Sequence, residues 1–298
     1  MQVEGIAMAD QAPGFLSVAR WTDDQCRDYL ERRRWPSGPV CPKCGDRNPY
    51  SITRKSRTKN VVKTLYRCRA CRKDYTVTVG TIFEDSHIPL IKWFAAIYLM
   101  VGSKKGISSH QLHRELELTY RSAWFMSHRI REAMRDKNLP FLTGTIEADE
   151  TYIGGKPRGH RVWRERARDE VEMGLLEKPR NRAPSEGKLA MFGILERDGR
   201  VRSLHVDRVT AQNMRSILLK NIDKKTSRLM TDRHPAYRPI RRDLPHSVIG
   251  HELTYVDPEH PDIHTQAIEG YWSLLKRGIY GVFHHVSSPY LGNYLKRV

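Results

Sequence analysis

The sequence lacks any long hydrophobic run. Its most apolar stretch, residues 93–102 with the sequence WFAAIYLMVG, is much shorter than the roughly 18 apolar residues that a membrane-spanning helix needs. The N-terminal segment, MQVEGIAMADQAPGF, is acidic and polar and lacks the pattern of a secretory signal peptide. We therefore expect a cytoplasmic protein without membrane contact.

Cysteine is also scarce, with five residues in the chain, which argues against a disulfide-rich secreted scaffold. Four of them form two Cys-x-x-Cys pairs, Cys41 with Cys44 and Cys68 with Cys71. This spacing lets both thiolates of a turn face one tetrahedral ion, and the 23 residues between the pairs fit a hairpin. A redox pair would need only one such motif. We therefore predict a structural Zn²⁺ site that stabilises a ribbon with little apolar surface.

Acidic residues are outnumbered by basic ones. Asp plus Glu is 34 against 52 for Lys plus Arg, which gives a formal net charge of +18. A charge this large does not specify a fold, but it favours association with a polyanion and a strong dependence on salt. Duplex nucleic acid is the polyanion we expect, and a protein that is basic for other reasons is the alternative. The 298 residues allow two or three domains of roughly 100–200 residues each.

The N-terminal third contains a helix and the cysteine pairs. Residues 1–36 are predicted to form a loose tail and then a helix that begins at a cap near Thr22. Prolines and glycines end this helix, and a zinc ribbon is predicted over residues 37–82. Within it, VVKTLYRC is β-prone, and apolar residues alternate with polar ones from Tyr75 to Val79, as in a strand.

The apolar period becomes helical over residues 87–137. PLIKWFAAIYLMV has a continuous apolar face, GISSHQLHRELEL begins at a serine cap, and TYRSAWFMSHRIREAMRD begins at Thr119. Short helices followed by a longer, arginine-bearing one are typical of a helix-turn-helix DNA-binding domain. A plain three-helix linker domain is the alternative. The candidates to face a DNA groove are Arg121, Ser122, His128 and Arg129.

A second, α/β body is predicted over residues 143–298. GTIEADETYIGG is strand-like, and KLAMFGILERDGRVRSLHVDRV contains two strands around an Asp198–Gly199 turn. AQNMRSILLKNI is an amphipathic helix capped by Thr210, SRLMTD is a short buried strand, and TQAIEGYWSLLKRGIYGVF is a helix. Residues 156–187 are charged and poor in apolar side chains, so they are expected to form a basic insertion without a core of its own.

Three carboxylates of this body are candidates for a metal site. Asp149 lies in the strand-like run, where alternation points it to the same face as Glu147. Asp232 ends the buried strand, and Glu269 lies on the first turn of the last helix. Two-metal nucleases and polymerases need two or three carboxylates around ions roughly 3.5–4 Å apart. Spacing alone leaves open that these residues are ordinary surface acids.

The chain resembles insertion-sequence transposases with an N-terminal zinc ribbon and a DDE core, the ISXO-type prokaryotic relatives of Merlin elements. The matching segments are YLERRRWPSGPVCPKCG, YRCRACRKDYTVTVGTIFEDSHIPLIKWFAAIYLM, IEADETYIGG, TDRHPAY and HTQAIEGYWSLLKRGIYGVFHHVS, and they cover most of residues 23–290. The resemblance implies a ribonuclease H-like catalytic core in which Asp149, Asp232 and Glu269 bind two Mg²⁺ or Mn²⁺ ions. The 36 residues between Asp232 and Glu269 lie within the range that such cores use.

The resemblance also implies DNA contacts near the active site. Lys276 lies two helical turns after the candidate glutamate and on the same face, where the family places a Lys or Arg against DNA, and Arg277 follows it. His264 and Thr265 are expected to support the metal ligands or to position DNA, and Thr265 could equally cap the helix. Trp272 either stacks on a base or, as its helical spacing favours, packs in the core.

The sequence departs from the family's pattern in two places. Gln266 stands where the family commonly has Asn. The family usually continues beyond YLGNYLKRV with another helical segment, so we expect this copy to be shortened.

The predicted function is that of a DNA transposase located at the nucleoid. It would bind the terminal inverted repeats of a mobile element, hydrolyse a phosphodiester and transfer the freed 3′-hydroxyl to target double-stranded DNA. A homo-oligomer, a dimer or larger, is expected because two element ends must be joined. The alternatives are a catalytically inactive zinc-ribbon DNA-binding protein and a ribonuclease H-like nuclease that cuts without strand transfer.

Overall fold

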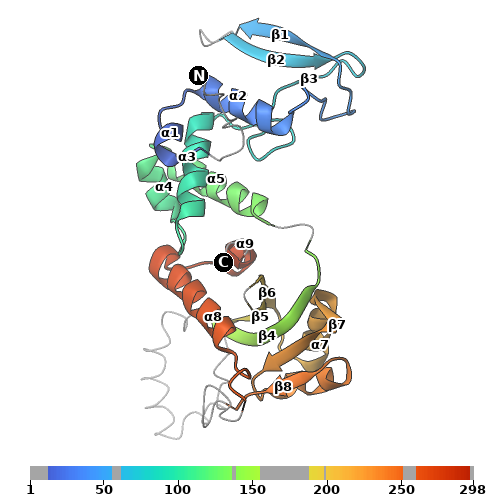
Figure 1. Cartoon of the computed structure of the whole chain (residues 1–298). Coiled ribbons are helices and arrows are strands. Elements are labelled where there is room, and N and C mark those ends of the chain that lie inside the picture. The colour runs from blue at the N-terminus through green and yellow to red at the C-terminus, as the bar shows by residue number, and fades with distance from the viewer. Residues whose placement is uncertain are drawn as a thin grey trace, which may run out of the picture. The chain divides into compact units, whose positions relative to one another are not determined.

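The computed structural model describes residues 13–55, 62–135, 139–154, 188–197, 199–250 and 260–295. The chain divides into two compact units, Met1–Ala133 and Met134–Val298 (Figure 1). The predicted basic insertion at 156–187 and Asp198 of the predicted turn lie outside the described residues. Within the described ranges, no helix is long and apolar enough to cross a membrane.

The first unit begins with two helices and a small antiparallel sheet in the order β1-β2-β3. These elements are α1 (Phe15–Val18), α2 (Asp23–Arg34), β1 (Pro49–Lys55), β2 (Val62–Cys68) and β3 (Asp74–Tyr75). Helix α2 begins at the predicted cap, because the hydroxyl of Thr22 accepts the Gln25 N–H and the Gln25 side chain accepts the Thr22 N–H. Strands β1 and β2 form the hairpin that joins the two cysteine pairs.

The strand predicted to run from Tyr75 to Val79 is wrong beyond Tyr75. β3 ends at Tyr75, and the carbonyl groups of Val77 and Val79 accept hydrogen bonds from the guanidinium of Arg34, at 2.5 and 2.6 Å. These carbonyls are thus satisfied by a side chain of α2 rather than by a neighbouring strand. An alternating apolar pattern does not reveal such a competitor from another element.

A helical region completes the first unit. It consists of α3 (Leu90–Gly102), α4 (Ser109–Glu115) and α5 (Tyr120–Ala133). The hydroxyl of Ser108 caps α4 by accepting the Gln111 N–H, and the hydroxyl of Thr119 accepts the Ser122 N–H at the start of α5. Between the two helices the chain reverses through Glu117, whose φ of 49° is unusual for a residue with a side chain.

The second unit is built on a mixed five-stranded sheet in the order β6-β5-β4-β7-β8. Its strands are β4 (Leu142–Ile153), β5 (Leu189–Glu196), β6 (Val201–Val206), β7 (Ile222–Thr231) and β8 (His246–Val248). β5 pairs antiparallel with both β4 and β6, whereas β4, β7 and β8 are mutually parallel. The predicted hairpin between β5 and β6 is present, and the Glu196 N–H donates to the Arg200 carbonyl at its end.

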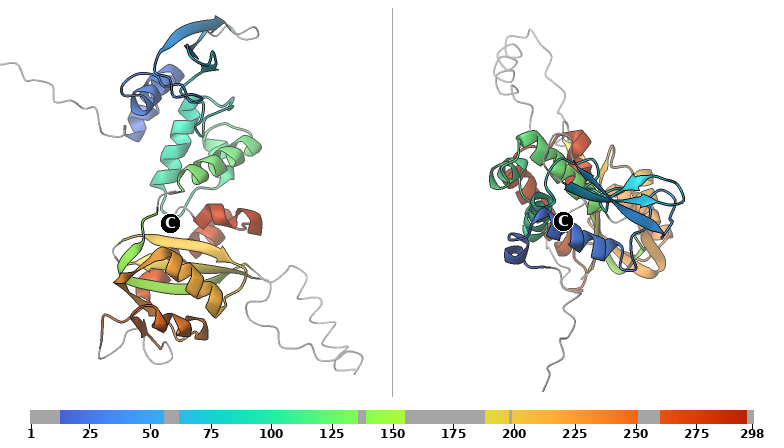
Figure 2. Two further views of the ribbon diagram at one scale, coloured as in Figure 1. Left: turned by 90° about the vertical axis from the view of Figure 1, so that its right-hand side faces the viewer. Right: turned by 90° about the horizontal axis from the view of Figure 1, so that it is seen from above.

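Helices cover both faces of this sheet. They are α7 (Ala211–Asn221), the 3₁₀ helix η1 (Pro235–Arg242), α8 (Gln266–Gly278), the π-helical turn η2 (Ile279–Phe283) and α9 (Ser288–Leu295). One core cluster joins residues of the sheet to α7 and η1, and another joins it to α8 and α9. In Figure 2 (left view), α7 is the orange helix that crosses the sheet. Because side chains alternate along β4, Ile146 and Ala148 face α7, whereas Glu147 and Asp149 face α8.

Candidate active site and zinc site

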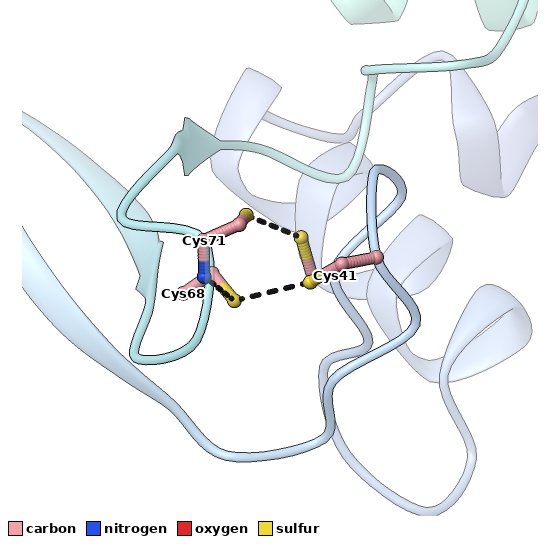
Figure 3. Close-up of side chains that lie close together, drawn as sticks. Cys41, Cys68 and Cys71 are labelled. Atoms are coloured by element: carbon pink, nitrogen blue, oxygen red, sulfur yellow. Dashed lines mark hydrogen bonds between the residues drawn. The ribbon is translucent and has the colours of Figure 1, made fainter.

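The four paired cysteines converge on one point. Figure 3 shows Cys41 of the first pair pointing toward Cys68 and Cys71 of the second. The sulfur atoms of Cys41 and Cys71 are 3.7 Å apart, those of Cys44 and Cys68 are 3.5 Å apart, and all four lie within 4.8 Å of one another. A tetrahedral zinc ion with Zn–S bonds of about 2.3 Å separates its sulfur ligands by about 3.8 Å. The cluster therefore has the size of a structural zinc site.

The surroundings of Cys41 favour its thiolate, whereas at Cys44 and Cys68 burial and neighbouring side chains raise the pKa despite hydrogen bonds from backbone N–H groups. Burial raises the pKa of Cys41, but hydrogen bonds from the backbone N–H groups of Cys44 and Lys43 outweigh it and lower the pKa to about 7. A zinc ligand must be deprotonated, so a thiol that ionises near neutral pH is prepared for the metal.

Asp149 lies at the contact between the sheet and α8. The indole Nε1–H of Trp272 donates a hydrogen bond of 3.0 Å to Oδ2 of Asp149. Gly193 is paired with Asp149 across β4 and β5, and a Cβ at Gly193 would lie 2.6 Å from the Trp272 ring. The absence of a side chain at Gly193 thus lets the indole reach the carboxylate. Trp272 is buried, as the core-packing alternative expected, yet it also holds a candidate metal ligand.

Asp232 follows β7, the parallel neighbour of β4. Glu147 pairs with Met230 in this register, and extending it by two residues sets Asp149 beside Asp232. The backbone N–H of His234 donates to Oδ1 of Asp232 at 3.0 Å. Burial, and then the charges of Glu150 and Asp232, raise the pKa of Asp149 to about 7. These carboxylates therefore repel one another, as expected of a site that a divalent cation would neutralise.

Glu150 is a member of this acidic group that sequence reasoning missed. It points to the opposite face of β4 from Asp149, where its carboxylate accepts a very short hydrogen bond from the Tyr237 hydroxyl. Nδ1 of His234 lies 3.8 Å from the same carboxylate. Burial and the charge of Asp232 raise the pKa of Glu150. Its position next to Asp149 in the sequence was the available signal, and strand alternation gives the face it points to.

Glu269 lies on the first turn of α8 and is half-buried. The Thr265 hydroxyl donates to its carboxylate at 3.3 Å and makes no capping bond to the helix backbone. Among the described residues, only the four cysteines form a group of three or more potential ligands with donor atoms all within 4.8 Å. Asp149, Asp232 and Glu269 therefore do not form a group with this spacing.

A buried ion pair anchors the start of α8. Glu147 is fully buried, and its carboxylate accepts bonds from Nε of Arg197 at 2.6 Å and from the backbone N–H of Ile268 at 3.0 Å. The same guanidinium donates to the carbonyl groups of Asp262 and His264, at 2.7 and 2.8 Å. Arg197 thereby ties the end of β5 to the segment that leads into α8. Neither residue was expected to have this role, because their pairing depends on how distant elements pack.

Comparison with known proteins identifies the family. The model of the ISXO2-like transposase domain matches residues 141–298, more than half of the chain. The chain belongs to the ISXO2-like transposase family. A transposase zinc-ribbon domain matches residues 21–74, which include all four converging cysteines. A relative from Halobacterium salinarum, an uncharacterized protein in transposable element ISH50, is 27% identical over 276 residues, or 91% of this chain and 88% of the relative.

Membership of this transposase family confirms the resemblance on which the sequence interpretation depended, and the family implies DNA binding and divalent metals. Of the basic residues proposed to touch DNA, Arg121 is exposed on the first turn of α5, Lys276 is half-buried on α8, and Arg277 is exposed. Arg129 donates to the Glu84 carbonyl at 2.7 Å, and its guanidinium lies over the Phe125 ring.

His264 has a different environment from these basic side chains. Its Nδ1 lies 3.4 Å from the carboxylate of Glu147, and its carbonyl accepts from Arg197. In this transposase, His264 therefore contacts the buried ion pair that anchors α8.

Proposed function

We propose that this transposase binds the terminal inverted repeats of its element, hydrolyses a phosphodiester there and joins the freed 3′-hydroxyl to target DNA. One observation carries the catalytic part. Asp149 lies on β4, Asp232 directly follows β7, the parallel neighbour of β4, and Trp272 ties Asp149 to the helix that bears Glu269. The strand order, with an antiparallel hairpin on one side of β4 and parallel strands on the other, supports a ribonuclease H-like core.

The proposed metal ligands are Asp149, Asp232 and Glu269, and their oxygen donors match the preference of Mg²⁺ or Mn²⁺. When bound, two such ions would activate the attacking water in hydrolysis or the attacking 3′-hydroxyl in joining, and would stabilise the leaving oxygen. The protein's own residues hold the ligands in position. Trp272 keeps one oxygen of Asp149 oriented, and the Glu147–Arg197 pair holds the start of α8, hence the first turn on which Glu269 lies.

The first unit is proposed to recognise the element ends. The zinc ribbon over 37–82 and the helix-turn-helix-like domain over 87–137 are assigned to DNA, and residues 143–298 to catalysis. The short α4, the turn at Glu117 and the longer α5 support the helix-turn-helix assignment. Arg121 is positioned on α5 where recognition helices contact base edges, near the N-terminus. Since two ends must be joined, we propose a dimer or a larger homo-oligomer on DNA.

The test is strand transfer by purified full-length protein with Mg²⁺ or Mn²⁺ and DNA that carries the element's own ends. Asp232→Ala should abolish both cleavage and joining, whereas Asp207→Ala, which removes an exposed acid after β6, should leave both intact. Cleavage without joined products would indicate a nuclease instead. Binding of the ends with neither product would indicate a DNA-binding protein without catalytic activity.

A further inference from the structure

A pocket of about 490 Å³ lies beside Asp232, on the η1 side of the sheet. It is lined by Asp232, Arg233, His234, Tyr237, Arg238, Arg241, His246 and Val248. The lining residues come from the end of β7, from η1 and from β8, so the pocket lies at the carboxyl ends of two parallel strands. Ligands of open α/β sheets bind at this edge.

The geometry of η1 explains why arginines gather here. In a 3₁₀ helix, side chains three residues apart lie one above the other. Tyr237 and Ile240 share one such row and are buried against the sheet, whereas Arg238 and Arg241 share another row and are exposed at the pocket. Gly250 leaves space for the third arginine, because a Cβ there would lie 2.4 Å from the guanidinium carbon of Arg233.

Guanidinium groups outnumber carboxylates among the residues that line the pocket, and one polar atom there is unsatisfied. Burial, and then the charge of Arg241, lower the pKa of His246 to about 4, so this imidazole is neutral near pH 7. The charged groups that line the pocket are then three guanidinium groups and Asp232, and the carboxylate of Glu150 lies behind this wall, bonded to Tyr237. Nε2 of His246 contacts the Thr231 hydroxyl at 2.8 Å, while its Nδ1 is buried without a hydrogen-bond partner in the described part of the chain.

We propose that this pocket binds a backbone phosphate of the substrate DNA, next to the phosphodiester that is cut. Guanidinium groups present paired N–H donors that match phosphate oxygens, and the pocket contains three of them. Since Asp232 forms part of the wall, a phosphate held by Arg238 and Arg241 fixes the strand relative to the carboxylates. The nature of the ligand rests on the proposed function, whereas the arginine-lined pocket itself does not.

This assignment predicts how the reaction depends on DNA. Arg238 and Arg241 bind a phosphate that does not react, so losing them weakens binding of the substrate and of the transition state alike. The DNA concentration needed for half-maximal cleavage should rise, and the rate at saturating DNA should change little. Each lost phosphate contact should also lower the slope of log affinity against log salt by about 1.

The experiment compares the double variant Arg238→Gln/Arg241→Gln with Arg208→Gln, which removes an exposed charge after β6, at the opposite edge of the sheet. Binding of labelled duplex DNA to the full chain is measured by fluorescence anisotropy over a salt series, and cleavage is measured over a range of DNA concentrations. Thermal melting checks that each variant is folded. Arg238→Lys/Arg241→Lys, which keeps the charge but not the paired donors, should recover part of the affinity.

We expect the double Gln variant to bind DNA roughly tenfold more weakly, with a salt slope smaller by 1–2, while Arg208→Gln loses less. Equal losses in affinity and slope for the two variants would overturn the proposal. Melting is also measured with inorganic phosphate added. If phosphate stabilises the wild type but not the double Gln variant, while both bind DNA equally well, the proposal is also overturned, because the pocket would then hold a free anion. If the variants lose DNA binding as expected but the wild type cleaves nothing, the proposed function is wrong, whereas the assignment of the phosphate pocket is supported.

Discussion

Asp149→Asn should stabilise the protein, and increasingly so as the pH rises, when no divalent cation is added. Burial and the charges of Glu150 and Asp232 raise the pKa of Asp149 from its ordinary value of 3.8 to about 7. A carboxyl with a raised pKa binds more protons in the folded state than in the unfolded state. Its ionisation therefore lowers the free energy of unfolding progressively between about pH 4 and pH 7, and the loss is complete above pH 7.

The magnitude follows from the size of the shift. At 1.36 kcal/mol per pKa unit, a shift of about three units means that ionisation of Asp149 lowers the free energy of unfolding by at most about 4 kcal/mol at pH 8. At pH 5 the same ionisation lowers it by less than about 2 kcal/mol. Asp149 is not fully buried and its neighbours can relax, so we expect about half of the difference between these values. The advantage of Asp149→Asn over the wild type should thus grow by about 1–1.5 kcal/mol from pH 5 to pH 8.

Urea unfolding followed by circular dichroism at several pH values measures this difference. The amide oxygen of Asn can still accept the bond from Trp272, so packing is largely retained. Asp207→Asn, at an exposed acid of the same unit, is the control and should show no such trend. Adding Mg²⁺ at pH 8 should stabilise the wild type more than the variant and reduce the difference. A difference that stays constant or shrinks as the pH rises would refute the reasoning.

Three further changes test the packing around the two sites. Gly193→Ala should cost about 1–3 kcal/mol, since its Cβ would lie 2.6 Å from a buried indole, whereas Gly270→Ala, with nothing within 4 Å, should not destabilise; urea unfolding measures both. Arg197→Ala should cost about 3 kcal/mol by the same measurement, because it removes the guanidinium partner of the buried Glu147 carboxylate, and adding Glu147→Gln should recover part of it; no recovery would contradict the pairing. Cys68→Ser should abolish zinc binding, as measured by metal analysis, and should remove the protection of backbone amides in β1 and β2 from hydrogen exchange. An equal loss of amide protection in the second unit would contradict a role of zinc limited to the ribbon.

Features that depend on neighbouring residues in the chain could be predicted from the sequence. The two-residue spacing of Cys41 and Cys44 is sufficient to form half of a tetrahedral site, whatever the remainder of the chain does. The caps at Thr22, Ser108 and Thr210 follow in the same way, because each hydroxyl bonds to an N–H only three residues away. Local spacing therefore accounts for these helix starts and for the zinc ligands.

The alternation along β4 was equally readable, and it correctly put Glu147 and Asp149 on one face. A periodic pattern reports which face is buried but not which element lies against it. That the indole of Trp272 bonds to Asp149, and that Arg197 pairs with Glu147, depends on contacts between segments 123 and 50 residues apart. Long-range packing decides these partners because a buried polar group bonds to whatever the fold brings near it.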